Sequence, residues 1–417
     1  MKFSKLSGFL LFLVLIGIGL YWKNETFSPS PINNEFSLPE PYVNIPSVTT
    51  PPDTPRLYAK YACVMDSDSG RILYGKKENS KAAMASTTKI MTSLLVLESG
   101  RMDEIVTASA YASSMPKVHL GMRKGYQYKM SDLLFSLMLE SHNDTAVAIA
   151  EHMAGSVENF AQKMNEKAQK IGMKNTHFVT PNGLDAEGHY STASDMCKLA
   201  AYAIKNKEFC SLIQTKTQTI TTIDGKHTYS LYNRDAFLSY YEGALGIKTG
   251  FTGDAGYCFV GAAKRNNITL VSCVLASGWP PDKNFKWIDT KSLMDFGMNH
   301  FSHFQFPIQD LSKTKIPVED GKTAYLSCEQ IPSLHTLLGK FENIKVIYDL
   351  PQKLYAPVRK DIAIGTVSFY INDILYKKEE VFPAQSIEKS NFSDTIRNVF
   401  DLCLETFFGQ QTTQNEF

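Results

Sequence analysis

The feature that most restricts the fold is the distribution of β-prone segments along residues 58–300. Two short β-prone runs, 59–66 (AKYACVMD) and 71–76 (RILYGK), are joined by Ser-Asp-Ser-Gly, which predicts a hairpin. Helical patterns follow at 86–97, 130–154, 157–171 and 193–203. Strand patterns then return near 217–222, 244–249, 257–264 and 269–276. A helical middle between strand-forming ends predicts one α/β unit whose sheet takes strands from both ends.

The pattern changes at about Phe306. Segments that alternate or carry β-branched residues follow, separated by Pro and Gly, at 323–328, 344–350, 362–370 and 373–382. This sequence pattern predicts a small β-rich domain over 306–390. The predicted fold class is therefore α/β (α+β), with a large domain at 58–305 that a smaller β-rich domain follows in the sequence.

The N-terminal segment has a basic start followed by an apolar run. Lys2 and Lys5 precede seventeen uncharged residues at 6–22, which a helix would stretch to roughly 25 Å. Residues 1–23 are therefore interpreted as a signal peptide or a membrane anchor. Eight prolines follow within 24–57, and this density predicts an extended tether. In either case we expect the rest of the chain to be exported.

The C-terminal residues 391–417 predict an amphipathic helix and a polar tail. Apolar residues recur at steps of three and four between Phe392 and Phe408, and Gln and Thr dominate beyond them. The apolar stripe can pack on the protein itself or on a membrane surface. The polar face lacks the Lys and Arg excess of typical interfacial helices, and both readings remain open.

Composition excludes several classes of protein. Lys and Arg number 43 against 42 Asp and Glu, and this balance argues against a protein that coats nucleic acid. The seven cysteines form no C-x-x-C pair, which argues against a disulfide framework and a paired-cysteine zinc site. The nine histidines show no ligand spacing, so no metal and no cofactor are expected.

The strongest chemical signal is Ser86-Thr87-Thr88-Lys89 at the start of a helical stretch. Residues three apart share a helix face, so Ser86 Oγ and Lys89 Nζ can approach each other. A serine hydroxyl needs a neighbouring base, and a lysine serves when desolvation or a nearby cation lowers its pKa. S-x-x-K alone is a weak signal, because most copies are solvated helix faces.

Two further polar groups raise the specificity. Ser141-His142-Asn143 lies between two apolar helical segments, and Lys248-Thr249-Gly250 ends a β-prone run. Lysine and a threonine hydroxyl can bind a carboxylate, and glycine lets a ligand lie against the strand. Each group alone is more often structural than functional.

Taken together, the order S-x-x-K, S-x-N, K-T-G resembles the penicillin-recognising serine acyltransferases. The sequence segments around the three motifs make the resemblance more specific. ASTTKIMTSLLVLE, SHNDTAVAIAEHMAG and GIKTGFTGDAGYCFVGAAKRN closely resemble the low-molecular-mass D-alanyl-D-alanine carboxypeptidases of bacterial cell walls (peptidase family S11). The resemblance covers about 58–300. Residues 306–408 more weakly resemble that family's β-rich C-terminal domain and amphipathic tail. The implied fold is a serine β-lactamase/D,D-peptidase-like catalytic domain.

The resemblance also implies roles for individual residues. Ser86 would attack the D-Ala-D-Ala carbonyl, Lys89 would take its proton, and Ser141 would relay protons to the leaving D-alanine. The substrate-binding residues would be Asn143, Lys248, Thr249, Gly250 and Phe251, and the N–H groups of Ser86 and Phe251 would form the oxyanion hole. The implied partners are peptidoglycan stem peptides ending in D-Ala-D-Ala, β-lactam antibiotics and the outer face of the cytoplasmic membrane.

Two histidines near the motifs need separate consideration, and the first is a departure from the family pattern. His142 occupies the middle of S-x-N, where glycine or alanine is usual, and we expect its ring to point outward. His189 lies in a loop that resembles the family (GLDAEGHYST), where a loop hydrogen bond is expected more often than a ligand contact.

Three other functions use the same cleft. A serine β-lactamase would need a deacylating glutamate, and none can be assigned by spacing. A D,D-transpeptidase would pass the acyl group to an amine, and a silent wall-binding protein would use the cleft without catalysis. Intact Ser86, Lys89 and Lys248 argue against the silent protein.

Overall fold

The computed structural model describes residues 42–393 and residue 396. The expected N-terminal segment 1–23, residues 24–41 of the expected tether, and nearly all of the expected C-terminal helix lie outside these residues. The chain divides into two units. One comprises residues 45–307 with 333–344, and the other comprises 308–332 and 345–393 with the described residues before 45.

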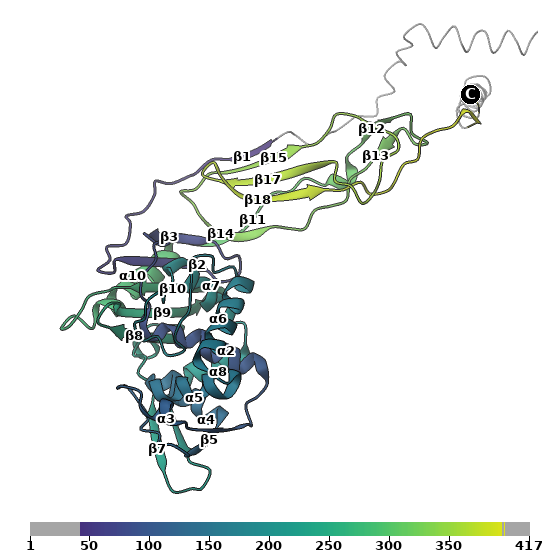
Figure 1. Ribbon diagram of the computed structural model, residues 1–417. Helices are drawn as coiled ribbons and strands as arrows, with labels where there is room; N and C mark the ends of the chain where they lie inside the picture. The colour runs from purple at the N-terminus through teal and green to yellow at the C-terminus, as the bar shows by residue number, and fades with distance from the viewer. Residues whose placement is uncertain (1–41, 394–395, 397–417) are drawn as a thin grey trace, which may run out of the picture. The chain divides into compact units, whose positions relative to one another are not determined.

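The larger unit is built on a five-stranded antiparallel sheet (Figure 1). Its strand order is β3 (Ile72–Lys76), β2 (Tyr61–Asp66), β10 (Ile268–Leu275), β9 (Gly256–Arg265), β8 (Ala244–Thr252). The first two strands come from the predicted hairpin and the other three from the second half of the unit. The prediction of one sheet drawing on both ends of an α/β unit is confirmed.

Helices cover both faces of this sheet (Figure 1). Alternate residues of β2 explain how, since side chains of a strand point to opposite faces. Ala62 and Val64 pack in a core with Leu293 of α10 (Phe285–His300). Cys63 and Met65 pack in the larger core, beneath α7 (Ala193–Ala203) and the other helices. A strand buried on both faces must be nearly continuously apolar, as YACVMD is.

Besides α7 and α10, this unit has nine helical segments among the described residues. They are η1 (Ala85–Thr88, a 3₁₀ turn), α2 (Lys89–Ser99), α3 (Ala110–Ser113), α4 (Met130–Phe135), η2 (Ser136–Glu140, a π-helix), α5 (Asn143–Ala154), α6 (Val157–Ile171), α8 (Lys207–Gln214) and α9 (Phe237–Tyr240). The larger unit also contains three small antiparallel strand pairs: β4 (Ile105–Thr107) with β5 (Gln127–Lys129), β6 (Thr217–Thr221) with β7 (Thr228–Tyr232), and β11 (Phe301–Gln305) with β14 (His335–Gly339).

The long helical pattern expected over 130–154 is interrupted in the structure. The π-helix η2 ends at Glu140, the next residue Ser141 has a φ of 70° in the left-handed region, and α5 starts anew at Asn143. Ser141 and His142 therefore occupy a break between two helices, and Asn143 is the first residue of the second. Single π turns of this kind are frequent at functional sites.

The smaller unit is β-rich, as predicted. One sheet has the order β1 (Tyr42–Ile45), β15 (Ile344–Asp349), β17 (Gly365–Ile371), β18 (Ile374–Val381). A second has the order β13 (Tyr325–Leu326), β12 (Ile316–Glu319), β16 (Leu354–Tyr355), and the short helix η3 (Leu311–Lys313) precedes it. Strand β1 lies within the tether expected over 24–57, so part of that segment pairs with a sheet. The short alternating run YVNI is compatible with a strand despite the prolines around it.

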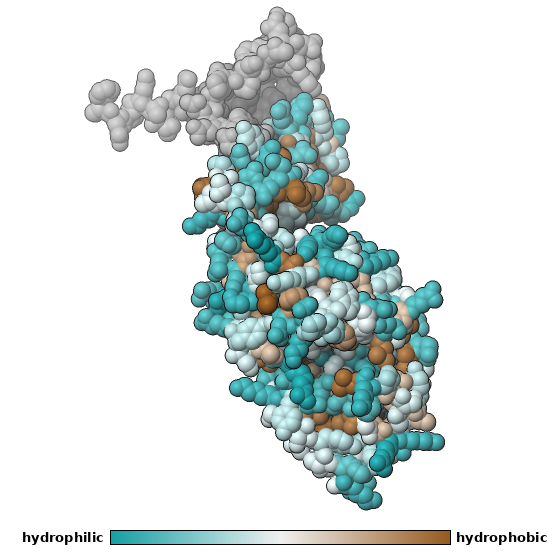
Figure 2. Space-filling model, turned by 90° about the vertical axis from the view of Figure 1, so that its left-hand side faces the viewer, coloured by the Kyte–Doolittle hydropathy of each residue, from teal (hydrophilic) through white to brown (hydrophobic). Residues whose placement is uncertain are grey.

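Figure 2 shows one face of the molecule, on which hydrophilic residues predominate and hydrophobic ones form small separate groups. Among the helices that the structure describes, none combines the length and the apolar character that crossing a bilayer requires.

Candidate active site

The predicted nucleophile lies in a tightly held turn. Ser86 is the second residue of η1, directly before α2, and its neighbour Ala85 has a φ of 48°. The side chains of Thr87 and Thr88 are buried and donate to the carbonyls of Met84 (2.6 Å) and Ala85 (2.8 Å). The two threonines of A-S-T-T-K therefore fix the backbone around Ser86, while Ser86 itself is half-buried.

Lys89 is the predicted partner of Ser86, and the structure brings them together. Lys89 Nζ donates to Ser86 Oγ (2.8 Å), to Asn143 Oδ1 (2.9 Å) and to the carbonyl of Asn182 (2.6 Å). Its side chain is fully buried. Burial first, and then the positive charge of Lys248, hold the Lys89 pKa well below its usual range, although Asp144 opposes them. Both effects favour the neutral amine, which is the form that can accept the proton of the serine hydroxyl.

The S-x-N residues approach the same point from the break between η2 and α5. Ser141 Oγ is buried and has no hydrogen-bond partner among the described residues. Asn143 reaches Lys89 with its Oδ1 and donates from Nδ2 to the carbonyl of Pro116 (3.3 Å). A buried hydroxyl without a partner is costly unless a ligand or water completes it.

Asp144 holds the segment 116–122, which contacts Asn143. Its carboxylate accepts hydrogen bonds from the backbone N–H groups of Leu120 (2.9 Å), Gly121 (2.9 Å) and Met122 (3.0 Å). The N–H of Asn143 also donates to the carbonyl of Val118 (2.8 Å). The 116–122 segment is therefore tied to the start of α5, which sequence reasoning did not foresee.

The K-T-G residues lie in the second half of β8, an edge strand of the sheet that continues to Thr252. Lys248 is 2% exposed, and its Nζ donates to the carbonyl of Thr249 (3.2 Å). Burial lowers the pKa of Lys248 to about 8, and Asp235 opposes this shift. Thr249 is half-buried, and Phe251 is 44% exposed with its ring against Tyr257. Thr249 and Phe251 are thus the more accessible members of the group.

Gly250 also has a packing role that sequence reasoning did not indicate. A Cβ at this position would lie 2.9 Å from the Ser86 nitrogen, 3.0 Å from Ala85 Cβ and 3.1 Å from the Thr87 nitrogen. Real Cβ atoms essentially never come closer than about this distance, so glycine is required for β8 to pack on η1. The glycine lets the strand approach the nucleophile turn itself.

Comparisons with known proteins agree with this geometry. Residues 48–278 match the family Peptidase S11, described as D-alanyl-D-alanine carboxypeptidase. D-alanyl-D-alanine carboxypeptidase DacF of Bacillus subtilis is 30% identical over 80% of this chain and 87% of its own length. DacA of Escherichia coli K12 is 29% identical over 86% of this chain and 91% of its own length. The chain belongs to this family.

Solved structures extend the likeness to the fold. Penicillin binding protein 5 from Haemophilus influenzae is 27% identical, with a TM-score of 0.68 over 82% of this chain and 100% of that structure. The Streptomyces K15 DD-transpeptidase is 32% identical, with a TM-score of 0.55 over 60% of this chain and 100% of that structure. The predicted class is confirmed: this is a serine-type peptidase, a low-molecular-mass penicillin-binding protein with an α/β catalytic domain and a β-rich C-terminal domain.

The loop 172–192 supplies an active-site residue that sequence reasoning missed. The carbonyl of Asn182 accepts from Lys89 Nζ (2.6 Å) and, at 3.4 Å, from Ser86 Oγ. Its side-chain Oδ1 accepts from the N–H of Leu184 (3.0 Å), which fixes the turn. The Asn-Gly pair in TPNGLD is a turn signal, but a turn signal does not indicate where the turn's carbonyl points.

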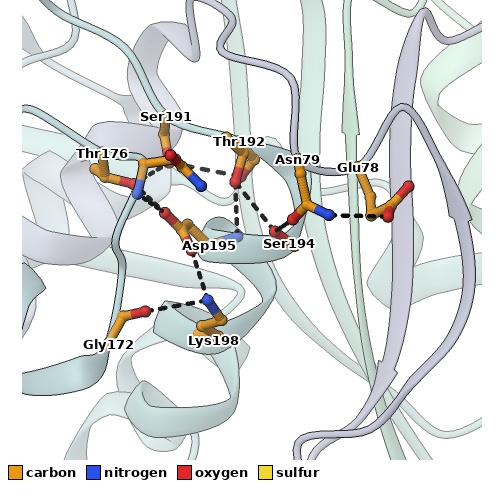
Figure 3. Close-up of polar contacts among 10 residues, drawn as sticks. Glu78, Asn79, Gly172, Thr176, Ser191, Thr192, Ser194, Asp195 and Lys198 are labelled. Atoms are coloured by element: carbon orange, nitrogen blue, oxygen red, sulfur yellow. Dashed lines mark hydrogen bonds and ion pairs between the residues drawn. The ribbon is translucent and has the colours of Figure 1, made fainter. Parts of the chain in front are cut away.

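A polar network anchors both ends of this loop (Figure 3). Asp195 at the start of α7 accepts from the N–H of Asn175 (2.8 Å), from Thr176 Oγ1 (2.9 Å) and from Lys198 Nζ (2.7 Å). Lys198 Nζ also donates to the carbonyl of Gly172 (3.0 Å). At the other end, the backbone of Ser191 pairs with that of Ala82. The loop is therefore tied to the catalytic unit on both sides of Asn182.

The expectation that His142 points outward is wrong. The ring is 5% exposed, its Nδ1 lies 2.8 Å from Ser136 Oγ, and its Nε2 lies 3.5 Å from Glu140 Oε2. Burial lowers the pKa of His142 to about 4, so the ring is neutral at pH 7. The imidazole packs inward because Ser136 offers it a hydrogen bond below the break at Ser141.

Asp235 is a second residue that the motifs did not indicate. It is 7% exposed, and its Oδ1 accepts from the N–H of Phe237 (2.9 Å), while Oδ2 has no partner among the described residues. Burial raises the Asp235 pKa to about 7, against the opposing charges of Lys248 and Lys286. Within the described residues, no group of three or more His, Cys, Asp and Glu side chains could hold a metal ion.

Proposed function

We propose that Ser86 is the nucleophile and Lys89 the general base of D-Ala-D-Ala cleavage. Ser86 Oγ bonds to the carbonyl carbon of the penultimate D-alanine while its proton passes to Lys89 Nζ. The observation that carries this assignment is the 2.8 Å contact between these atoms, with the amine fully buried and its pKa lowered. A base within hydrogen-bond reach of the proton it removes is the first requirement of such catalysis.

Ser141 completes the proton path to the leaving group. Its buried Oγ lacks a partner among the described residues, so a hydroxyl is available to pass a proton to the departing D-alanine amine as the C–N bond breaks. Asn143 holds Lys89 in place and presents its amide to the substrate. Water then attacks the acyl-enzyme ester, which releases the shortened peptide and restores Ser86.

The second half of β8 binds the peptide in this proposal. An extended peptide can add to an exposed strand edge, where main-chain hydrogen bonds hold it. Lys248 and Thr249 attract the terminal carboxylate, Gly250 keeps the strand close to η1, and Phe251 borders the substrate. The N–H groups of Ser86 and Phe251 stabilise the oxyanion, since preorganised donors act where negative charge develops.

The substrate is the peptidoglycan stem pentapeptide, which is trimmed to a tetrapeptide, and β-lactam antibiotics acylate the same serine. The test is mass spectrometry of a purified pentapeptide muropeptide after incubation with the enzyme, with and without an acceptor amine. We expect release of D-alanine and a tetrapeptide carrying a new carboxylate. A crosslinked product would instead indicate transpeptidation, and no product would indicate a silent binding protein.

Labelling with a fluorescent penicillin tests the nucleophile separately. Ser86→Ala should lose both labelling and D-alanine release, because no acyl-enzyme forms. Ser211→Ala, in α8, is the matched control and should keep both. Labelling of Ser86→Ala at the wild-type rate would contradict the assignment.

We further propose that the enzyme works at the outer face of the cytoplasmic membrane, attached by residues 6–22, by the 392–408 segment, or by both. The sequence patterns of these segments support the proposal. Fractionation of the wild type, a 392–417 deletion, a form with an introduced signal cleavage site and a form that combines both changes tests it. If the form lacking both segments stays on membranes, the proposal fails.

A further inference from the structure

His189 lies on the loop 172–192, which also carries Asn182, and it contacts Thr88 of η1. Its ring is 7% exposed. Nδ1 accepts a hydrogen bond from the N–H of Val179 (2.9 Å), so this nitrogen carries no proton. In the neutral ring the proton is then on Nε2, which lies 3.0 Å from Thr88 Oγ1. Burial lowers the His189 pKa to about 4, against the charge of Asp185, which agrees with a neutral ring at pH 7.

The contacts form a directed chain of three hydrogen bonds. The Val179 N–H donates to His189 Nδ1, His189 Nε2–H donates to Thr88 Oγ1, and the Thr88 hydroxyl donates to the carbonyl of Ala85 (2.8 Å). Because His189 Nε2 donates, the single proton of the Thr88 hydroxyl is free to point at the Ala85 carbonyl. The tautomer of the histidine thus sets the direction of the threonine hydroxyl.

The end of this chain is the peptide plane between Ala85 and Ser86. The carbonyl oxygen of Ala85 and the N–H of Ser86 belong to one planar trans peptide and point in opposite directions. Anchoring the oxygen therefore orients the N–H. Ala85 has a φ of 48°, a conformation that a non-glycine residue keeps only when its surroundings hold it.

A second neighbour confines the same oxygen. A Cβ on Gly183 would lie 2.0 Å from the Ala85 carbonyl oxygen and 2.9 Å from Thr88 Oγ1. Gly183 has a φ of 83°, which also favours glycine. The loop 172–192 therefore packs directly on the Ala85 carbonyl, next to the Thr88 hydroxyl that donates to it.

We propose that His189 is a positioning residue that, through Thr88, holds the Ala85–Ser86 peptide plane and so aims the Ser86 N–H at the oxyanion. The inference rests on the proposed function, because it assumes that the Ser86 N–H is an oxyanion-hole donor. His189 itself touches neither the substrate nor Ser86.

Two substitutions at position 189 separate the two nitrogens. His189→Asn keeps an acceptor near the place of Nδ1 but loses the donor toward Thr88. His189→Gln places an amide N–H near Nε2 and keeps that donor. We expect kcat to fall by about 10- to 100-fold in His189→Asn, somewhat less than the loss of a whole oxyanion donor, with KM nearly unchanged. His189→Gln should recover most of this loss.

The threonine tests the middle of the chain. Thr88→Val removes the hydroxyl at similar size and should lower kcat by about as much as His189→Asn, whereas Thr88→Ser should retain activity. The double variant His189→Asn with Thr88→Val should be no worse than either single variant, because both break one chain. His177→Gln is the matched control: it changes a histidine of the same loop that contacts the Gly188 carbonyl and not Thr88.

Infrared spectroscopy of the acyl-enzyme gives a readout that simple loss of stability would not change. A carbonyl held by two oxyanion-hole donors is polarised and absorbs at lower frequency. With a ¹³C-labelled penicillin, the ester band should shift to higher frequency in His189→Asn and Thr88→Val and stay in place in His189→Gln and His177→Gln. If either of the first two fails to fold, the other carries the test.

The proposal is overturned if kcat and the ester band of His189→Asn and Thr88→Val match the wild type, or if their losses in kcat multiply in the double variant. The proposed function fails in a different way: wild-type enzyme would then release no D-alanine, or Ser86→Ala would still be labelled.

Discussion

Lys89 and Lys248 are two buried amines in one site, and their surroundings give them different tasks. Lys89 is hydrogen-bonded to Ser86, Asn143 and Asn182, and burial, followed by the charge of Lys248, lowers its pKa. Lys248 has the carboxyl of Asp235 as a counter-charge, which keeps its pKa at about 8. In the proposed mechanism the first amine therefore serves as the base and the second keeps its charge for a carboxylate, a separation typical of sites with paired ionisable groups.

Lys89→Arg tests the first role. A guanidinium does not lose its proton in this pH range, so it cannot accept the Ser86 proton even though the positive charge remains. We expect the rate constant of acylation by a fluorescent penicillin to fall at least about a thousandfold. Lys248→Arg should reduce acylation less and mainly weaken substrate affinity. Equal acylation rates in Lys89→Arg and wild type would remove Lys89 from the role of base.

Asp235→Asn tests the second role through pH dependence. Lys248 must be protonated to attract the carboxylate, so kcat/KM should fall as the pH rises through about 8. Asp235 raises the Lys248 pKa, and removing its charge should move this alkaline limb to lower pH. The measurement is kcat/KM for a D-Ala-D-Ala peptide between pH 6 and 10. Asp224→Asn, in the turn between β6 and β7, is the control, and an unmoved or upward-shifted limb in Asp235→Asn would contradict the assignment.

At the scale of elements, η1, the η2–α5 break, the second half of β8 and the loop 172–192 meet at the site. Lys89 Nζ and the Asn182 carbonyl contact Ser86 Oγ, Asn143 contacts Lys89, and Gly250 packs on η1. Asp144 ties α5 to the 116–122 segment, and Asp195 ties α7 to the start of the loop. Catalytic groups are placed within a fraction of an ångström because the elements beneath them cannot move independently.

Gly250→Ala tests the packing of β8 on η1. The added Cβ would meet backbone nitrogens of Ser86 and Thr87, so the strand and the turn must separate. A displacement on the order of 1 Å costs about a hundredfold in rate, and we expect kcat/KM to fall by roughly that factor. Gly253→Ala is the matched control, because its Cβ would meet nothing within 4 Å. Steady-state kinetics on both variants would contradict the prediction if they lose activity equally.

At the scale of the whole molecule, the catalytic unit is not one continuous stretch of chain. Residues 333–344 return to it after the chain has entered the β-rich unit, and β14 pairs with β11. Arg71 and Glu342 form an ion pair with side-chain exposures of 11% and 7%, and Arg71 also donates to the carbonyl of Leu337. Glu342 Oε2 accepts from the N–H of Gly339 (2.9 Å), which fixes the turn after β14.

Glu342→Gln tests the contribution of the Arg71–Glu342 ion pair to stability. The glutamine can still accept from Gly339, but Arg71 loses its counter-charge in a nearly buried place, and breaking a buried pair from one side costs about 3–5 kcal/mol. We expect the free energy of unfolding of the catalytic unit to fall by about that amount, measured in a denaturant titration that follows penicillin labelling. Lys226→Gln, which removes one half of an exposed pair with Asp224, should leave the midpoint unchanged. An equal shift of the denaturation midpoint in both variants would contradict a stabilising role of the Arg71–Glu342 pair.

The sequence by itself determined the fold class, the motifs and the pairing of Ser86 with Lys89, because period-2 and period-3.6 patterns and an i, i+3 spacing are local properties of the chain. It also indicated the family, whose motifs are short and ordered. Only the tertiary structure brought Asn182, His189 and Asp235 to the site, since each acts through a backbone carbonyl, a second side chain or a buried charge. The inward position of His142 and the reason for Gly250 were likewise decided by neighbours distant in sequence. A residue pattern records which groups a segment carries, whereas burial and close approach depend on which other segments pack against it.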